Sequence, residues 1–405
     1  MGKLLPFLTV LSFVFAVACR NNSVVETDTG IQETARKICE EQLILDSHID
    51  WPERLYSSPA DLSQLTESRD FDLVRAKTGG LNAVLSVLYV PAELGPEEGR
   101  FMLDSMLDLV TGYAVRYPDR VALARNPGEV AANFAKGLLS IPLCLENGSP
   151  IGDDLSYIEA LQKKGMAYIT LCHAKSNQIC DSNYDSIRPW KGVSPFGEEV
   201  IREMNRQGIM IDISHSTDST VVQALRISEA PIVATHSSCR HFTPGFERNL
   251  SDTLIKAIAE KNGVVMIGFS SMFLDSTCSV NSEYLLNWFD STGVAWESQE
   301  GTEFMQTFSV THKLRADAAQ LVDHIDHVVR IAGIDYVGFG SDFDGMGPSQ
   351  PTGLPDVSSY PVVVAEMLRR GYSGEEVVKV LSKNFLRVWQ EVLNVSIVLQ
   401  KEPAG

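Results

Sequence analysis

The sequence predicts a (β/α)8 TIM barrel with loop insertions at its C-terminal face, and three observations favour this fold class. Eight short apolar runs follow one another along the chain with helical patterns between most of them, which favours a barrel over an open doubly wound sheet. No run is followed by the Gly-x-Gly-x-x-Gly turn of a dinucleotide-binding sheet. His48, His215 and His236 each lie just past such a run, at the end of a barrel where chemistry is built.

The eight runs are apolar enough to be buried parallel strands. They cover residues 43–47, 83–90, 139–145, 167–171, 209–214, 232–235, 263–268 and 336–340. Helical patterns include residues 100–117, 195–207 and 317–332 before the third, fifth and eighth strands, and 359–370 and 373–392 at the end of the chain. We therefore expect one barrel domain over residues 36–400.

Two long segments, residues 51–78 and 269–311, interrupt the alternation of strands and helices. The first is rich in charged residues and Ser, and the second carries the large aromatic residues Trp288, Phe289, Trp296 and Phe304. Loops of this length in a compact domain are usually functional or disordered. We interpret both as lids on the active face of the barrel.

Composition excludes some classes of partner. The 405 residues are 44% hydrophobic and 21% charged, which is ordinary for a globular protein with a large core. The formal net charge of −18 is spread along the chain, which argues against nucleic acid or an anionic membrane surface as a partner. We find no internal repeat and no second domain in the sequence.

The N-terminus predicts export. Lys3 supplies a positive start, residues 4–18 are mainly apolar, and the segment is too short for a membrane span, so residues 1–18 are expected to be a signal peptide. Ala16-Val-Ala-Cys19 resembles a bacterial lipoprotein processing site, which makes Cys19 the candidate lipidated residue and residues 19–35 a lipid-anchored tether. The alternative is an ordinary secretory signal cut before Cys19. The preferred location is the bacterial cell envelope, periplasmic or outer-membrane anchored.

Six further cysteines follow Cys19. Cys172 and Cys180 are close enough in sequence to form a disulfide in an oxidising compartment. The absence of a Cys-x-x-Cys pair argues against a Cys-rich structural zinc site. We expect most of these residues to be buried, inert thiols.

Five residues are candidate metal ligands. His48 and Asp50 lie two apart at the end of a strand, point the same way, and can share one metal ion. Glu146 directly follows an apolar strand, where an unpaired carboxylate would be costly if buried, and one carboxylate can bridge two ions. His215 and His236 offer neutral imidazoles to a second ion, so we expect a two-cation centre of zinc or a similar metal that activates water.

Each of these assignments has a plainer alternative. His48 could be a hydrogen-bonded loop histidine capped by Asp50, and Glu146 could be an exposed loop residue. Without further information, His173 is equally well a substrate contact or a satisfied loop histidine, and Arg248 a surface residue. The histidines at 324 and 327 fall on one predicted helix, which we expect them to hold to the barrel.

Asp342 follows the eighth strand and is the candidate catalytic acid and base. A carboxylate beside a bridging water can accept its proton and deliver it to a leaving nitrogen. Asp344, which precedes Gly345, is favoured as a structural residue that binds turn amides. A serine hydrolase is not indicated because there is no Gly-x-Ser-x-Gly elbow, and a zincin is excluded because there is no His-Glu-x-x-His helix.

Taken together, eight motifs in order resemble the membrane (renal-type) dipeptidase family, from about residue 40 to Asn384-Phe-Leu-Arg-Val. The motifs are His48-x-Asp50, Glu146, Leu171-Cys-His173, Ile213-Ser-His215-Ser, Ala234-Thr-His236-Ser-Ser, Arg248-Asn249, Asp323-His-Ile-Asp-His327 and Gly340-Ser-Asp342-Phe-Asp-Gly345. The sequence departs from the family pattern at Ile49, where Asn is usual, and at Asn147, where Gly is usual. The resemblance implies a zinc-dependent dipeptidase on an amidohydrolase-like TIM barrel.

The resemblance also implies roles for single residues. His48 and Asp50 would bind one zinc ion, and Glu146 would bridge it to a second. His215 and His236 would bind that second ion. The resemblance further assigns the scissile carbonyl of the substrate to His173, its terminal carboxylate to Arg248, and the proton transfers to Asp342.

The predicted function is hydrolysis of a short peptide with a free C-terminal carboxylate, with dipeptides carrying a D-residue at that position among the candidates. The expected partners are the small peptide substrate and, through the lipid anchor alone, a membrane. A homodimer is implied by the resemblance only. Two alternatives stay open: an amidohydrolase acting on N-acyl amino acids, lactones or other esters, and a non-catalytic binding lipoprotein with a vestigial metal site.

Overall fold

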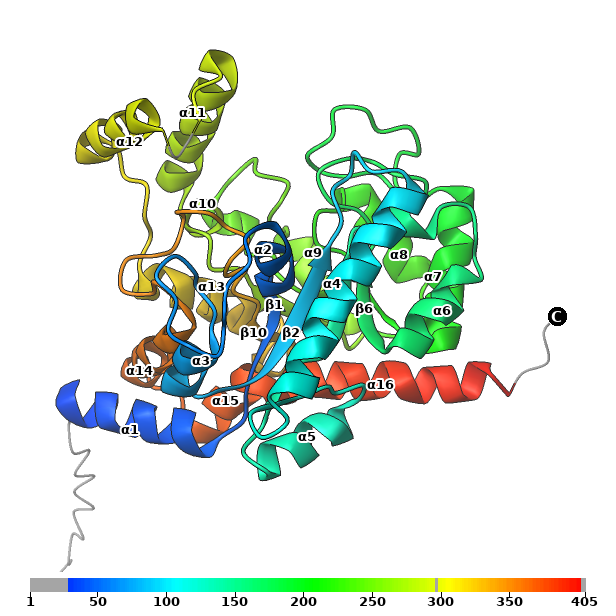
Figure 1. Cartoon of the computed structure of the whole chain (residues 1–405), viewed down its shortest axis with the longest axis horizontal. Helices are drawn as coiled ribbons and strands as arrows, with labels where there is room; N and C mark the ends of the chain where they lie inside the picture. Colours follow the sequence, from blue (N-terminus) through cyan, green and yellow to red (C-terminus); the bar gives the residue numbers. More distant parts are fainter. Residues whose placement is uncertain (1–27, 296–297, 402–405) are drawn as a thin grey trace, which may run out of the picture.

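The computed structural model describes residues 28–295 and 298–401, and its centre is one parallel sheet (Figure 1). The strands are β1 Ile44–Ile49, β2 Leu81–Tyr89, β3 Val121–Ala122, β4 Leu139–Ser140, β5 Leu143–Glu146, β6 Met166–Thr170, β7 Met210–Asp212, β8 Val233–Ala234, β9 Val264–Ile267 and β10 Val337–Phe339. They pair in the order β10-β9-β8-β7-β6-β5-β2-β4-β3, and β1 pairs with β2. This arrangement confirms all eight predicted strands.

The two ends of the sheet meet at β1 and β10. Ile49 bridges Phe343 in parallel, just beyond β10. The amide of Asp342 donates to the carbonyl of His48 at 2.9 Å, and that of Asp50 donates to the carbonyl of Phe343 at 3.0 Å. The eight principal strands therefore form a barrel, and the same backbone contacts bring two candidate site loops together.

The third predicted strand is divided into β4 and β5, which both pair with β2. The break contains Pro142, which has no amide hydrogen for the ladder. Its carbonyl still accepts from the amide of Ser86 at 2.8 Å, so the direction of the chain is kept. The short strand β3 pairs only with β4 among the described strands.

Helices cover the outside of the barrel and one of its ends (Figure 1). They are α1 Asp28–Glu41, α2 Trp51–Ser57, α3 Leu73–Gly79, α4 Pro96–Arg116, α5 Pro127–Ala135, α6 Tyr157–Lys164, α7 Pro195–Gln207, α8 Asp218–Ile227, α9 Asp252–Glu260, α10 Ser271–Leu274, α11 Ser276–Thr292, α12 Gln299–Thr311, α13 Ala318–Ile331, α14 Tyr360–Arg369, α15 Gly374–Val378 and α16 Asn384–Leu399. Short 3-10 turns are η1 Ser149–Ile151, η2 Arg240–Phe242, η3 Ile334–Tyr336 and η4 Val357–Ser359, and the π-turn η5 Lys379–Lys383 joins α15 to α16.

Local sequence explains where the barrel helices begin and end. The side chains of Ser194, Thr217 and Ser251 cap α7, α8 and α9 by accepting from backbone amides of the first turn. Gly165 and Gly208 end α6 and α7 in the left-handed conformation, which glycine adopts without strain. Each cap lets the chain turn back into the next strand.

The core has two layers because successive strand residues point to opposite faces. One layer lies between strands and outer helices. The other fills the barrel and joins strand residues such as Leu45, Leu85 and Met210 to Phe385 and Trp389 of α16. The carboxyl ends of the strands lie at the opposite end of the barrel from α16, and that end carries the candidate site.

The region predicted as a tether differs in part from the structure. Its last residues, 28–35, form the first turns of α1, which packs against α14 with Ala35 buried. Asp28 also pairs with Arg369 at 2.6 Å. The expected signal peptide, Cys19 and residues 19–27 lie outside the described residues. In the part of the chain that is described, no helix has the length and apolarity needed to cross a bilayer.

Both segments predicted as long loops contain helices, and the second is largely helical. The first contains α2 and α3, and the second contains α10, α11 and α12. α11 and α12 extend away from the barrel (Figure 1) and share a small apolar cluster of Leu285, Phe289 and Phe308. Polar residues such as Ser and Gln within these helices obscure the helical period in the sequence. Trp296 lies outside the described residues.

The six cysteines of the described part of the chain are free and buried, as expected for structural thiols. Cys172 and Cys180 do not form the disulfide that their spacing allows. Burial raises the pKa of the Cys144 and Cys180 thiols, which keeps them protonated and unreactive.

Candidate metal centre

The candidate ligands converge at the carboxyl ends of the strands. His48 belongs to β1 and Asp50 follows it, Glu146 is the last residue of β5, and the loops after β7 and β8 carry His215 and His236. All five are buried. The structure therefore brings together the whole predicted ligand set, and the exposed position that was the alternative for Glu146 is ruled out.

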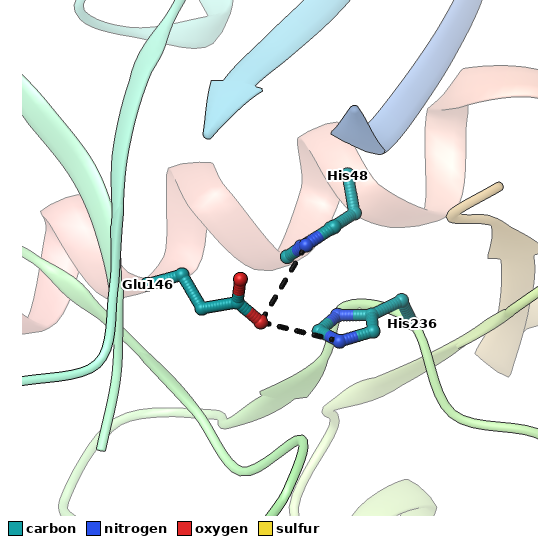
Figure 2. Close-up of side chains that lie close together, drawn as sticks. All are labelled: His48, Glu146 and His236. Carbon is teal, nitrogen blue, oxygen red and sulfur yellow. Dashed lines mark ion pairs between the residues drawn. The ribbon is translucent and has the colours of Figure 1, made fainter. Parts of the chain in front are cut away.

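Glu146 is the common partner in this set, and Figure 2 shows its carboxylate facing both His48 and His236. Its Oε1 atom is 3.6 Å from His48 Nε2, 3.2 Å from His215 Nε2 and 3.4 Å from His236 Nε2. Ligand atoms about 2.1 Å from one tetrahedral metal ion are separated by about 3.4 Å. The spacing therefore matches that of ligands around metal ions.

The donor atoms fit a metal in chemical terms as well. His48 Nε2 and Glu146 Oε1 are buried and have no hydrogen-bond partner, which is unusual for polar atoms in a folded protein. Imidazole and carboxylate are the ligands that zinc and similar ions prefer. The potential groups of ligands are His48 with Glu146 and His236, Glu146 with His173 and His215, and His48 with Asp50 and Asp342.

These groups overlap and do not divide the ligands into two separate sets. His236 is grouped with His48, whereas the resemblance pairs it with His215. The Nε2 atoms of His215 and His236 are nevertheless 2.8 Å apart, which is close enough to share an ion. The division of ligands between two ions thus stays a prediction.

The electrostatics of the centre favour a cation. Burial would lower the pKa of His48, but the carboxylates of Glu146 and Asp50 outweigh it and raise this pKa to about 10. For Glu146, burial alone would raise the pKa, but the nearby His48 and His173 hold it well below its usual range. The carboxylates thus draw positive charge to this point, and divalent ions would supply it.

Asp342 lies beside Asp50 on the loop after β10. Burial raises the pKa of Asp342 to about 6, and the Glu146 carboxylate acts in the same direction. The backbone of Asp342 is left-handed, with a φ of 67°. Strained conformations of this kind in non-glycine residues often occur at functional sites.

Gly345 allows this loop to approach the centre. A Cβ atom at this position would overlap Oδ2 of Asp50 and Oδ1 of Asp342. Asp344 faces away from these groups, and its Oδ1 accepts from the amide of Asp70 at 2.8 Å. The structure thus separates the two aspartates: Asp342 lies at the candidate centre, and Asp344 is structural but binds the amide of Asp70 instead of the turn amides that were expected.

His173 and Arg248 flank the ligand set. His173 Nε2 is 4.0 Å from Glu146 Oε1, and burial lowers the pKa of its imidazole. Arg248 is buried rather than on the surface, so the alternative reading for this residue is wrong. It donates to Ser237 Oγ at 2.9 Å and its guanidinium lies 4.9 Å from the ring centre of Phe273.

Sequence reasoning missed Tyr89, whose ring centre is 4.6 Å from that of His173. Tyr89 is the last residue of β2 and pairs with Glu146 in the sheet register. The candidate ligands were identified as polar groups at strand ends, and the same rule would have found Tyr89. Phe273 and Ser237 carry no such signal, because their proximity to Arg248 depends on how the loops fold.

A further group of His241, Asp252 and His327 lies outside the centre. Its hydrogen bonds indicate a structural role. His327 Nδ1 accepts from Arg330, so the ring proton lies on Nε2. Nε2 donates to Asp252 Oδ1 at 2.7 Å. No lone pair of His327 is then free for a metal. His324 likewise joins α13 to two loops, so the structural reading of both α13 histidines is confirmed.

Comparisons with known proteins agree with the geometry. The family model described as membrane dipeptidase (peptidase family M19) matches residues 32–403. Dipeptidase tcpJ of Claviceps purpurea (strain 20.1) is 31% identical over 366 residues, which is 87% of this chain and 77% of that relative. Dipeptidase verJ of Clonostachys rogersoniana is 29% identical over 340 residues, 82% of this chain and 78% of that relative.

Solved structures show the same architecture. The probable dipeptidase PvdM from Pseudomonas aeruginosa superimposes with a TM-score of 0.78 at 25% identity, over 90% of this chain and 99% of that one. A metallo peptidase from Rhodobacter sphaeroides, liganded with a phosphinate mimic of the dipeptide L-Ala-D-Ala, gives 0.72 at 23% identity, over 87% and 100% of the two chains. At that identity the second match supports the fold alone.

Proposed function

The chain belongs to the membrane dipeptidase family, whose members are metal-dependent, and from this premise we propose that it hydrolyses dipeptides at a centre of two zinc ions. The prediction of a metallodipeptidase is confirmed at the level of the family. The number and identity of the ions, the residue roles and the substrate stereochemistry are our proposal.

One observation carries the proposal of two ions. A single carboxylate oxygen, Glu146 Oε1, lies within 3.6 Å of three imidazole Nε2 atoms, one from β1 and two from the loops after β7 and β8. One tetrahedral ion cannot use these three imidazoles, Glu146 and Asp50 and also keep a position for water. Two ions that shared Glu146 would use all five ligands.

The remaining residues supply the proton transfers and hold the substrate. Bound zinc would polarise the scissile carbonyl and lower the pKa of coordinated water. Asp342 would take the proton of the attacking water as the carbon–oxygen bond forms, and return it to the amide nitrogen as the carbon–nitrogen bond breaks. His173 would donate a hydrogen bond to the developing oxyanion.

Arg248 explains the proposed preference for a short substrate. Its guanidinium is buried near the centre, so a substrate carboxylate that pairs with it lies close to the scissile bond. A longer peptide would leave Arg248 unpaired or overlap the loop that carries it. A dipeptide with a free C-terminal carboxylate satisfies both requirements.

The test combines metal analysis with a substrate panel. The purified protein should contain two zinc ions per chain, lose activity on chelation and regain it when zinc is restored. The panel compares L-Ala-L-Ala and L-Ala-D-Ala with their C-terminal amides, an N-acetyl amino acid, a lactone and a simple ester. We include the D-residue because of the ligand in the Rhodobacter structure.

We expect the free dipeptides to be the best substrates. Arg248→Met should raise KM for them by about 10- to 100-fold, the value of a charged hydrogen bond, and leave the amides unchanged. Faster turnover of the N-acetyl amino acid, lactone or ester would favour the wider amidohydrolase alternative. A single bound ion at full activity would contradict the two-ion centre.

We also propose that the protein is an exported lipoprotein acylated at Cys19. This part rests on the sequence alone. Mass spectrometry of the mature N-terminus should find a lipid on Cys19, and Cys19→Ser should release active enzyme from the membrane fraction. Cleavage before an unmodified Cys19 would support the secretory alternative, and light scattering would test the homodimer that the resemblance implies.

A further inference from the structure

The two histidines that face Glu146 in Figure 2 are supported from behind by different groups. We propose that Asp212, acting through Thr235, is a positioning residue that orients His236 for metal binding and strengthens zinc binding at the position of His236. This inference rests on the proposed two-ion centre. It concerns buried residues that the hydrolytic steps do not use.

Asp212 is the last residue of β7 and is fully buried. Its Oδ1 accepts from the amides of Ser214 at 3.1 Å and Thr235 at 2.9 Å. Its Oδ2 accepts from the hydroxyls of Thr170 at 2.6 Å and Thr235 at 2.7 Å. All four donors point toward the carboxylate and all four are neutral groups, so none of them offsets its charge.

The hydroxyl of Thr235 determines which nitrogen of His236 carries the proton. Thr235 uses its single proton to donate to Asp212, so its oxygen can only accept from His236 Nδ1, 3.0 Å away. The proton of His236 therefore lies on Nδ1. The lone pair of Nε2 then points toward Glu146, which is the tautomer that binds a metal.

His48 is held in the same tautomer by a different chain of hydrogen bonds. Its Nδ1 lies 2.9 Å from the hydroxyl of Tyr168, which donates in turn to the carbonyl of Ser47 at 3.0 Å. This chain ends in a neutral carbonyl, whereas that of His236 ends in a carboxylate. A longer contact of 3.4 Å also links His48 Nδ1 to the Thr235 hydroxyl.

The two hydrogen-bond chains end in groups of different charge, and this difference has electrostatic consequences. A carboxylate behind a ligating imidazole makes that ligand more basic and favours positive charge on its metal side. Asp212 itself is stabilised when a cation binds beyond His236, because its own donors are neutral. We therefore expect Asp212 and Thr235 to strengthen zinc binding at the position of His236.

A matched pair of variants tests the role of the hydroxyl. Thr235→Val keeps the shape of the side chain and removes the hydroxyl, whereas Thr235→Ser keeps the hydroxyl and removes the methyl group. Zinc affinity is measured by competition with a chromophoric chelator, which resolves the two binding steps. Thermal unfolding of the metal-free proteins checks that each variant folds.

We expect Thr235→Val to weaken zinc binding at the position of His236 by about 10- to 100-fold, the usual effect of losing such a partner. Thr235→Ser should bind like the wild type. Tyr168→Phe should weaken mainly the other position. Equal affinities for the Val variant and the wild type, or equal losses for Val and Ser, would overturn the proposal.

Asp212→Asn provides a second route should Thr235→Val not fold. The new amide group would donate to Thr235, which would then turn its own proton toward His236 Nδ1 and force the ring proton onto Nε2. Zinc binding at that position should be lost, and wild-type affinity would overturn the proposal. The number of zinc ions bound per wild-type chain tests the two-ion centre separately. The ratio of the zinc affinities of Thr235→Val and Thr235→Ser can be measured whether the site holds one ion or two.

Discussion

The metal centre and the α11–α12 hairpin are two regions built in opposite ways. The centre joins residues between His48 and Asp342, which are neighbours only because the strand ends meet. The hairpin lies within residues 276–311 and is held by contacts between its own aromatic side chains, such as Trp288 on Phe304 at 3.7 Å between ring centres. The first region depends on the whole barrel, and the second depends mainly on itself.

The comparison suggests that each region tolerates different changes. The centre concentrates buried carboxylates whose repulsion is relieved by a cation, so its side chains serve chemistry at a cost to stability. The hairpin buries apolar rings that serve local stability. Substitutions in the centre should therefore reduce activity and leave the fold intact, and substitutions in the hairpin should do the reverse.

The largest effect is expected for Glu146→Gln, which removes the charge shared by the ligands. Turnover should fall by more than about 10³-fold, because zinc binding is weakened and the water is no longer activated. The metal-free protein should still fold but unfold more easily than the wild type, because the folded state holds the pKa of Glu146 low and Gln leaves His48 without this charged partner. Kinetics, metal content and denaturant unfolding measure the three quantities.

Retention of substantial activity by Glu146→Gln would contradict the central role of this carboxylate. His215→Ala serves as the second variant and should also abolish turnover while the fold survives.

Asp342→Asn should have the next largest effect. It removes the proton acceptor, so kcat should fall by about 10²- to 10⁴-fold while zinc content stays unchanged. Asp344→Asn is the matched control, because its carboxyl group binds a loop amide away from the centre. A kcat loss in Asp344→Asn as large as that in Asp342→Asn would show that the loop as a whole, rather than the Asp342 carboxylate, is required.

His324 on α13 binds a loop beside the centre and the segment just before the hairpin. We expect the stability of this connection to fall in acid. His324 Nδ1 accepts from the amide of Cys239 at 2.9 Å, and its Nε2 donates to the carbonyl of Leu274 at 3.1 Å, just before α11. Burial lowers the pKa of His324 to about 4. Only a neutral ring can make both bonds, because the amide of Cys239 is itself a donor.

The sign of the pH effect follows from this lowered pKa. Between about pH 6.5 and pH 4 the unfolded chain binds a proton at His324 that the folded chain does not, so stability falls as pH falls. The loss from pH 7 to pH 5 should be about 2 kcal/mol. Denaturant unfolding of His324→Gln at both pH values should show a smaller difference than the wild type, and an equal difference would exclude His324 as the cause.

The smallest effect on activity is expected for Trp288→Ala in the hairpin. Loss of the stacking on Phe304 should cost about 1 kcal/mol of local stability, in addition to the apolar contact that Trp288 makes with the cluster of the hairpin. Amide hydrogen exchange should become faster over residues 276–311 and stay unchanged at the strand ends, while kcat and zinc content keep their wild-type values. A fall in kcat would show that the hairpin acts on the centre after all.

The candidate site could be predicted in unusual detail because its residues obey one rule. His48, Glu146 and His236 each lie at the end of an apolar run, and in a parallel barrel all strand ends meet at the same face. Order along the chain thus becomes proximity in space without knowledge of any side-chain contact. The helices of the hairpin obey no such rule, and their polar residues led us to expect a loop.

The sequence by itself determined the barrel, the set of candidate ligands and the separation of Asp342 from Asp344, because these follow from periodicity, from position relative to strands and, for Asp344, from the turn at Gly345. Only the tertiary structure decided what stands behind the ligands. That Asp212 reaches His236 through Thr235, and that Gly345 must lack a side chain beside Asp50, depend on contacts of a few ångströms between distant segments. Such contacts are set by the packing of the whole barrel, and no local pattern of residues records them.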